Sequence, residues 1–122
     1  MINVQTSNKV SQHQLMGATG RPVTSLRYTG DISSASRDAV VGSYEALDKN
    51  ASPSVLLDFK GVEYLNSSGI ALVIQVLMAA SKAGQTIAIC GLTPHFTKVF
   101  TMVGITKYAH LYADEAAALA AL

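Results

Sequence analysis

The chain is 122 residues long, which is enough for one domain with its own hydrophobic core and too short for a second. Charged residues make up 14% of the sequence, the formal net charge is +1, and lysines and arginines are scattered singly. This distribution lacks the basic stripe that follows a phosphate backbone, so we expect no nucleic-acid partner. The single cysteine, Cys90, excludes an internal disulfide, and its apolar neighbours predict burial in a strand.

The start of the chain has neither the basic stretch nor the apolar block of a signal peptide. The longest apolar run, residues 70–78, is much shorter than a membrane span. We therefore expect a cytoplasmic protein without direct membrane insertion. Residues 1–21 give weak signals: residues 2–6 favour a short strand, and the polar residues 7–14 alternate too poorly for an assignment.

In the next two segments the apolar residues recur with different periods, first that of a strand and then that of a helix. β-Branched and aromatic residues alternate over residues 23–28 and predict a strand that stops at Gly30 and Asp31. Serines within residues 33–36 are N-cap candidates, and apolar residues then recur at helical spacing up to Leu47. This pattern predicts an amphipathic helix.

The middle of the chain is its most apolar part. Residues 54–59 are almost continuously apolar, which predicts a strand in the centre of a sheet, followed by a turn over residues 60–65 that contains Gly61. Residues 70–83 predict the most apolar helix of the protein, with Gly84 as its C-cap.

The alternation of strands and helices continues to the end of the chain. Residues 85–90 predict a strand, and Thr93 is the expected N-cap of the helix that follows. Residues 108–112 favour a short extended piece, and an alanine-rich helix then begins with Asp114 and Glu115 in its first turn. This order predicts one α/β domain over residues 1–122, with right-handed crossovers and parallel strands.

The candidate functional site is Asn66-Ser67-Ser68-Gly69, where a buried strand passes into the start of a helix. Free N–H groups and the positive end of a helix stabilise anions, so a phosphoryl group on Ser67 would lie in a favourable field. Local chemistry alone leaves a second interpretation, in which Ser67 or Ser68 caps the helix.

Residues 55–70, VLLDFKGVEYLNSSGI, resemble the central signature of STAS domains. That signature is an apolar strand, Asp, an apolar residue, two spacers, Val, and an Asp-Ser-Ser/Thr-Gly-Leu/Ile core. Residues 28–32 resemble the family's Gly-Glu-Leu/Ile strand end, and residues 94–112 look like its third helix and final strand. The resemblance covers residues 22–122, with residues 1–21 matching weakly. It implies a mixed, mostly parallel sheet of four to five strands with about four helices.

The resemblance also implies a function. In the family's bacterial anti-sigma factor antagonists, a partner that is both anti-sigma factor and serine kinase phosphorylates the first serine of the core, and a metal-dependent serine phosphatase reverses the reaction. That serine matches Ser67, with Ser68 as the second choice. The family docks its partner through this turn and the helix after it. The matching residues are Ser33, Asn66, Ser67, Ser68, Gly69, Ile70 and Ile74.

The sequence departs from the family pattern at two positions beside the expected acceptor. Asn66 replaces the Asp that precedes the phosphorylated Ser, and Ser33 replaces the Asp at the end of the Gly-Glu-Leu-Asp turn. The loss of two carboxylates either eases the accommodation of phosphate or reflects lost recognition by a kinase. Sequence alone leaves both interpretations open.

The helix after Ser67 carries more apolar residues than one buried face needs. They are Ile70, Leu72, Val73, Ile74, Val76, Leu77 and Met78. Either neighbouring elements cover this helix on most sides, or part of it forms an exposed patch that docks a partner.

An enzymatic function is not expected. A triad of Ser67, Asp58 and one of His13, His95 or His110 lacks the G-x-S-x-G elbow of serine hydrolases. The histidines and Cys90 do not have metal-ligand spacing, and no Walker-type phosphate loop is present. We expect neither cofactor nor metal, and a chain that is a substrate of other enzymes.

Two further functions remain as alternatives to the antagonist. One is a non-catalytic STAS scaffold in a sensory complex, and the other is an accessory subunit of a lipid transporter, as some stand-alone STAS proteins are. The identity of the partner separates the three.

Overall fold

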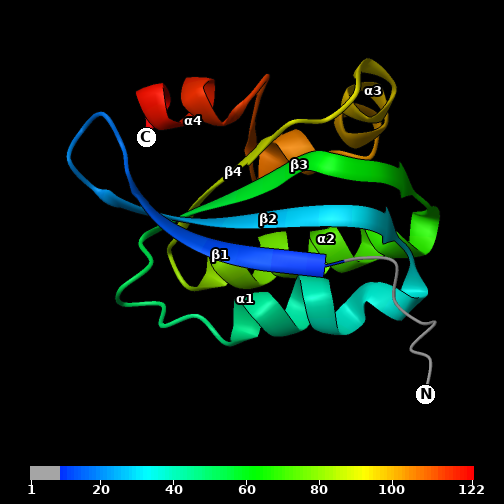
Figure 1. The fold of residues 1–122 in the computed structure, drawn as a ribbon, viewed down its shortest axis with the longest axis horizontal. Helices are drawn as coiled ribbons and strands as arrows, with labels where there is room; N and C mark the ends of the chain where they lie inside the picture. The colour runs from blue at the N-terminus through cyan, green and yellow to red at the C-terminus, as the bar shows by residue number, and fades with distance from the viewer. Residues whose placement is uncertain (1–8) are drawn as a thin grey trace.

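The computed structural model describes residues 9–122, so the strand expected over residues 2–6 lies outside the described residues. The described strands form one mixed five-stranded sheet in the order β1-β2-β3-β4-β5 (Figure 1). The strands are β1 (Lys9–Met16), β2 (Pro22–Ile32), β3 (Ser54–Leu65), β4 (Thr86–Cys90) and β5 (His110–Tyr112). β1 is antiparallel to β2, and the other neighbouring pairs are parallel. The α/β class and the mostly parallel sheet are thus confirmed.

Helical segments connect the parallel strands. A 3₁₀ turn (Ser34–Ser36), a π-helical turn (Asp38–Gly42) and α1 (Ser43–Glu45) join β2 to β3, and α2 (Ser67–Lys82) joins β3 to β4. α3 (Pro94–Met102) and a second 3₁₀ turn (Ile105–Lys107) join β4 to β5, and α4 (Glu115–Ala121) follows β5. The four α-helices agree with the expectation of about four.

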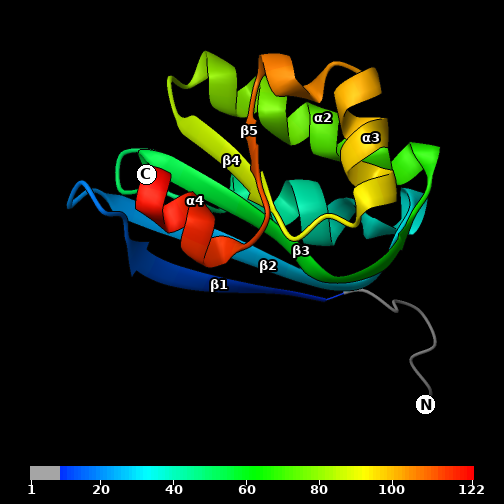
Figure 2. The ribbon, with the colours of Figure 1, turned by 90° about the horizontal axis from the view of Figure 1, so that it is seen from above.

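The sheet separates two apolar layers of unequal size. The larger core lies between the sheet and the segments α1, α2 and α3, and includes Leu26, Leu57 and Phe100. The smaller core lies under α4, where Ala118 and Leu122 cover residues such as Cys90. Figure 1 shows α1 and α2 on one side of the sheet and α4 on the other, and Figure 2 shows the same layers from above. Cys90 is fully buried in β4, as predicted.

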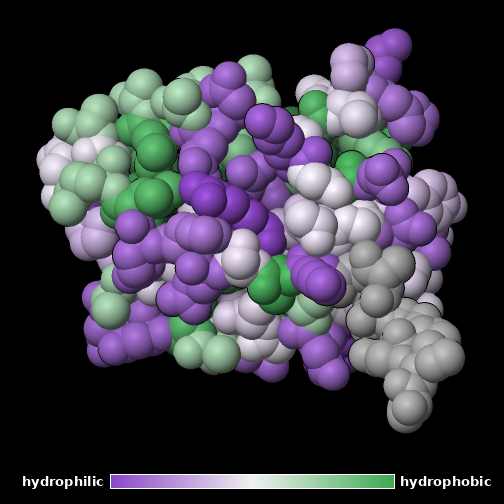
Figure 3. Space-filling model, viewed as in Figure 1, coloured by the Kyte–Doolittle hydropathy of each residue, from purple (hydrophilic) through white to green (hydrophobic). Residues whose placement is uncertain are grey.

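α4 is held to the sheet by a narrow apolar face. Ala118 is its buried residue, whereas its other alanines point outward. In Figure 3 hydrophobic residues gather over the end of the molecule where α4 lies, next to a hydrophilic band. The carboxylate of Asp114 caps the helix by accepting a hydrogen bond from Ala117 N at 2.8 Å.

Two predicted helix ends are confirmed, the start of α3 at Thr93 and the end of α2 at Gly84. The Thr93 hydroxyl accepts a hydrogen bond from Phe96 N at 3.2 Å at the start of α3. Gly84 follows the end of α2 with a φ of 75°, a left-handed conformation that glycine adopts without strain.

Two local predictions were wrong or incomplete. Residues 60–65 were expected to form a turn, but β3 continues through them to Leu65 beside β2, with register shifts in the pairing. Gly61 is there because the strands approach closely: a Cβ at this position would lie 2.7 Å from Thr29 Cγ2. The unassigned polar residues 7–14 overlap β1, an edge strand that pairs with β2 despite its weak alternation.

Candidate functional site

The candidate turn begins where β3 ends. Asn66 has an extended backbone (φ −95°, ψ 178°), and its side-chain Oδ1 accepts a hydrogen bond from Gly69 N at 2.9 Å. Asn66 is therefore the N-cap of α2, and the interpretation of Ser67 or Ser68 as the cap is wrong. Both serines are exposed in the first turn of α2, and neither hydroxyl has a hydrogen-bond partner within residues 9–122.

Gly69 fixes the turn against the end of β2. A Cβ at this position would lie 2.4 Å from Ile32 O and 2.8 Å from Ile32 C, so only glycine fits without a backbone shift. Asn66 N also donates a hydrogen bond to Ile32 O at 3.2 Å. The start of α2 is thus clamped to the carboxyl end of β2.

Ser33 lies beside this turn because it directly follows Ile32. Its hydroxyl accepts a hydrogen bond from Ala35 N at 3.3 Å, and Ser36 Oγ accepts one from Ser33 N at 3.0 Å. Ser33 therefore caps the 3₁₀ turn that leads into α1. The structure brings Ser33 and Asn66 together at the carboxyl ends of β2 and β3, where Ser33 follows Ile32 in the chain and Asn66 N donates to the carbonyl of Ile32.

The apolar residues of α2 lie on two faces of the helix, one buried in the core and one partly exposed. Five apolar side chains are buried in the larger core, namely Leu72, Val73, Val76, Leu77 and Ala80. Ile70 and Ile74 are partly buried against the same core, and Met78 is 46% exposed. We call Ile70, Ile74 and Met78 the α2 stripe. It starts one turn after Ser67 and repeats every four residues, so the three side chains lie along one face of the helix.

Polar groups border the α2 stripe. Arg37 Nη1 donates a hydrogen bond to Gln75 Oε1 at 3.0 Å, which ties α2 to the helical segment before α1. The N–H groups of Gly69 and Ile70 are used by the side chain and carbonyl of Asn66. Those of Ser67 and Ser68 have no partner within residues 9–122, so they are available to an anion.

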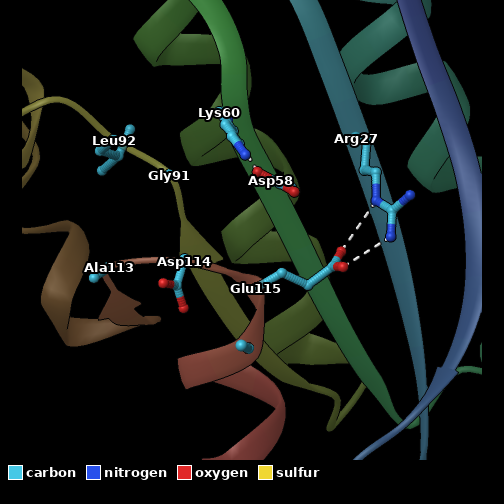
Figure 4. A pocket seen from close by; sticks show the side chains of 9 residues that line it. Arg27, Asp58, Lys60, Gly91, Leu92, Ala113, Asp114 and Glu115 are labelled. Atoms are coloured by element: carbon cyan, nitrogen blue, oxygen red, sulfur yellow. Dashed lines mark hydrogen bonds and ion pairs between the residues drawn. The ribbon is translucent and has the colours of Figure 1, made fainter.

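A hollow of about 750 Å³ lies on the α4 side of the sheet and was not foreseen from the sequence. Figure 4 shows Arg27, Asp58 and Lys60 on strands β2 and β3 facing Asp114 and Glu115 at the start of α4. Sequence patterns gave no signal because these residues come from distant segments and match no motif.

An ion pair closes one side of this hollow. Arg27 donates from Nη2 to Glu115 Oε1 at 2.8 Å and from Nε to Glu115 Oε2 at 3.1 Å, and Ser25 Oγ donates to Oε2 at 3.1 Å (Figure 4). The hydrogen bond from Arg27 is the main cause that lowers the pKa of Glu115. Burial raises the pKa of the Cys90 thiol, and the negative charge of Asp58 acts in the same direction. This region anchors α4 to the sheet.

The imagined hydrolase triad is not assembled. Asp58 lines the hollow on the α4 side of the sheet, whereas Ser67 begins α2, which packs on the opposite side. Among residues 9–122 no three His, Cys, Asp or Glu side chains are grouped closely enough to hold a metal ion. In the same part of the chain no helix has the length and apolar character required to cross a bilayer.

The comparison with protein families identifies the fold. The family model described as "Mlab, STAS domain" matches residues 18–113, which includes every strand from β2 to β5. The chain belongs to the STAS domain family. This confirms the resemblance seen in residues 55–70, and the model begins close to the end of the weakly matching segment 1–21.

The relatives of this STAS domain include named antagonists. An "Anti-sigma F factor antagonist" of Paenibacillus polymyxa is 24% identical over 103 residues, covering 84% of this chain and 88% of that protein. The crystal structure of an anti-sigma factor antagonist from Mycobacterium paratuberculosis has a TM-score of 0.70 at 18% identity, covering 91% of this chain and 92% of that one. The phosphorylated form of the Bacillus cell fate determinant SpoIIAA has a TM-score of 0.63 at 17% identity, with coverages of 88% and 96%. At these identities the structural likenesses show the fold alone.

Proposed function

We propose that this STAS domain is an anti-sigma factor antagonist whose binding to an anti-sigma factor with serine kinase activity is ended by phosphorylation of Ser67. The observation that carries the proposal is the free, exposed hydroxyl of Ser67 at the start of α2. Because Asn66 caps the helix, a modified Ser67 does not remove the cap. The relative named an antagonist supports the same function.

In the proposed phosphorylation this chain supplies only the acceptor hydroxyl, and the kinase supplies ATP and the catalytic base. Ser67 Oγ forms a bond to the γ-phosphorus of ATP on the kinase, the bond to ADP breaks, and a base of the kinase takes the hydroxyl proton. A metal-dependent serine phosphatase hydrolyses the ester with water and restores the hydroxyl. The phosphate adds roughly −1.5 to −2 charges. The free N–H groups of Ser67 and Ser68 and the helix dipole stabilise that charge.

Phosphorylation then acts on binding through the α2 stripe. Ile70, Ile74 and Met78 give a partner an apolar contact that begins one turn from Ser67. A phosphate at the edge of such a contact must lose water on docking, and this cost weakens the complex. Asn66 and Ser33 are uncharged, so no carboxylate at these positions repels the phosphate. We therefore interpret the replacement of the family's two Asp residues by Asn66 and Ser33 as a change that makes a phosphate on Ser67 easier to accommodate, and not as a loss of recognition by the kinase.

Mass spectrometry of the protein from its native cells tests the proposal. Native cells that express a tagged chain are grown under several growth and stress conditions, and the chain is purified together with its bound proteins. The tagged chain is wild type, Ser67→Ala or the matched control Ser68→Ala. We expect phosphate on the peptide containing Ser67 in wild type and in Ser68→Ala, and none in Ser67→Ala. The unphosphorylated chain should retain a histidine-kinase-like ATPase that the phosphorylated chain has lost.

Two results would overturn this function. Phosphate that persists in Ser67→Ala would move the acceptor to another residue. A chain that is unmodified in all conditions and retains a transporter subunit or other STAS proteins would make it an accessory subunit or a scaffold.

A further inference from the structure

The two edges of the sheet differ in how they are protected. β5 has three residues, and such a short edge offers little to pair with. β1 has eight residues in unbroken register with β2, contains no proline, and carries one lysine, Lys9, at its start. No described strand pairs with its outer side, and no described helix lies beyond it in Figure 2. Among residues 9–122 the outer backbone groups of β1 therefore form a long row without a strand partner.

The sequence of β1 is close to a palindrome in polarity. In Val10-Ser11-Gln12-His13-Gln14-Leu15-Met16 an apolar residue stands three positions to each side of His13, and a glutamine stands one position to each side. Val10 packs against the larger core and Leu15 against the smaller one, as the alternation of a strand requires. Residues equally far from His13 thus point to the same side of the sheet.

We propose that two copies of this chain associate through β1, antiparallel about a two-fold axis at His13, so that one sheet runs through both. An antiparallel strand pair places residues equally distant from the axis opposite each other. Val10 of one copy then faces Met16 of the other, and Gln12 faces Gln14. Met16 is 61% exposed in the single chain, and this pairing covers it.

Charge and register favour the same arrangement. β1 carries no carboxylate, and Lys9 falls opposite Gly17 of the second copy, so lysines do not meet. A register centred on Gln12 would leave Met16 beyond the described strand of the second copy. The interface does not involve the Ser67 turn, because β2 separates β1 from β3 in the sheet.

Light scattering and a position-specific cross-link test this proposal together. We expect the purified chain to have the mass of a dimer, in a concentration-dependent equilibrium. In His13→Cys the two new thiols lie on the axis, where directly opposite Cα atoms are about 4.5–5.5 Å apart and within reach of a disulfide. In the control Gln12→Cys they are diagonal neighbours, about 7–8 Å apart and too far for a disulfide. The buried Cys90 does not compete for oxidation.

A pair of methionine variants tests the apolar contact without any cross-link. Met16→Glu places a carboxylate against Val10 of the second copy, and we expect it to weaken the dimer about tenfold or more. Met102→Glu is the matched control, because Met102 is 84% exposed on α3 and should leave the dimer unchanged. Circular dichroism verifies that each variant is folded.

The proposal fails on any of three results. A wild-type monomer at the highest soluble concentration refutes it directly. A dimer in which Gln12→Cys cross-links as readily as His13→Cys has another register or another interface. A dimer that tolerates Met16→Glu as well as Met102→Glu is not held by β1. None of these results depends on whether Ser67 is phosphorylated.

Discussion

Replacing Gly69 with alanine should destabilise the protein, although alanine is the better helix former. Gly69 lies in the first turn of α2, and an added methyl group would lie 2.4 Å from Ile32 O and 2.8 Å from Ile32 C. Both atoms belong to the backbone of β2, so relief requires movement of a strand or of the start of the helix. Gly42 offers a control, since its nearest atom to a built Cβ is Asp38 Cβ at 3.9 Å.

The magnitude follows from two opposing effects. Overpacking a tight site costs about 1–3 kcal/mol, and the overlap at Gly69 with backbone places it at the upper end. The helix propensity of alanine returns at most about 1 kcal/mol. We therefore expect Gly69→Ala to lower the free energy of unfolding by about 2 kcal/mol. Gly42→Ala lacks the overlap and should raise it by up to about 1 kcal/mol.

Urea unfolding of both variants, followed by far-ultraviolet circular dichroism, measures these changes. In a domain of this size 1 kcal/mol corresponds to a shift in Tm of about 3–6 °C, so thermal unfolding gives an independent value. If Gly69→Ala is as stable as wild type, or if both glycine variants change alike, the close contact between the start of α2 and Ile32 is not what requires a glycine there.

Two further predictions concern the cap and the ion pair. Asn66→Ala should cost about 1 kcal/mol through loss of the cap, whereas Asn66→Asp should keep the cap and cost less, as urea unfolding of both will show; equal losses would contradict the capping role. Glu115→Gln removes a partly exposed ion pair with Arg27 and should cost less than about 1 kcal/mol at pH 7. Because the folded-state pKa of Glu115 is lowered, this stability is present above the unfolded pKa, near 4.5, and is lost as the pH falls through the folded pKa. The difference in stability between wild type and Glu115→Gln should therefore shrink as the pH falls below the unfolded pKa and vanish once the pH is below the folded pKa, and a difference that is constant with pH would contradict it.

Local sequence patterns located most elements because their signals are local. The apolar run at residues 54–59, the cap Thr93, the carboxylates at the start of α4 and Gly84 after α2 are each determined by residues close to them in the chain. The signature around Ser67 was also readable, since its residues are contiguous. Its assignment to the STAS family rested on that contiguity.

Two errors arose where long-range contacts decide the structure. Gly61 was interpreted as a turn residue, but it is there because Thr29 of β2 leaves no room for a side chain. β1 has little strand propensity of its own and is a strand because β2 offers an edge to pair with. A third error was local: the interpretation of Ser67 or Ser68 as the cap of α2 overlooked Asn66, which was an equally good candidate by residue type.

The sequence by itself determined the fold class, the order of most elements and the position of the serine turn, because periodicity, caps and a contiguous motif are properties of neighbouring residues. The tertiary structure alone decided which apolar residues of α2 remain exposed and that Gly69 rests on Ile32. It also decided that Arg27 and Glu115, 88 positions apart in the chain, form an ion pair on the α4 side of the sheet. Each of these depends on how distant segments pack, and the identities of neighbouring residues do not encode that packing.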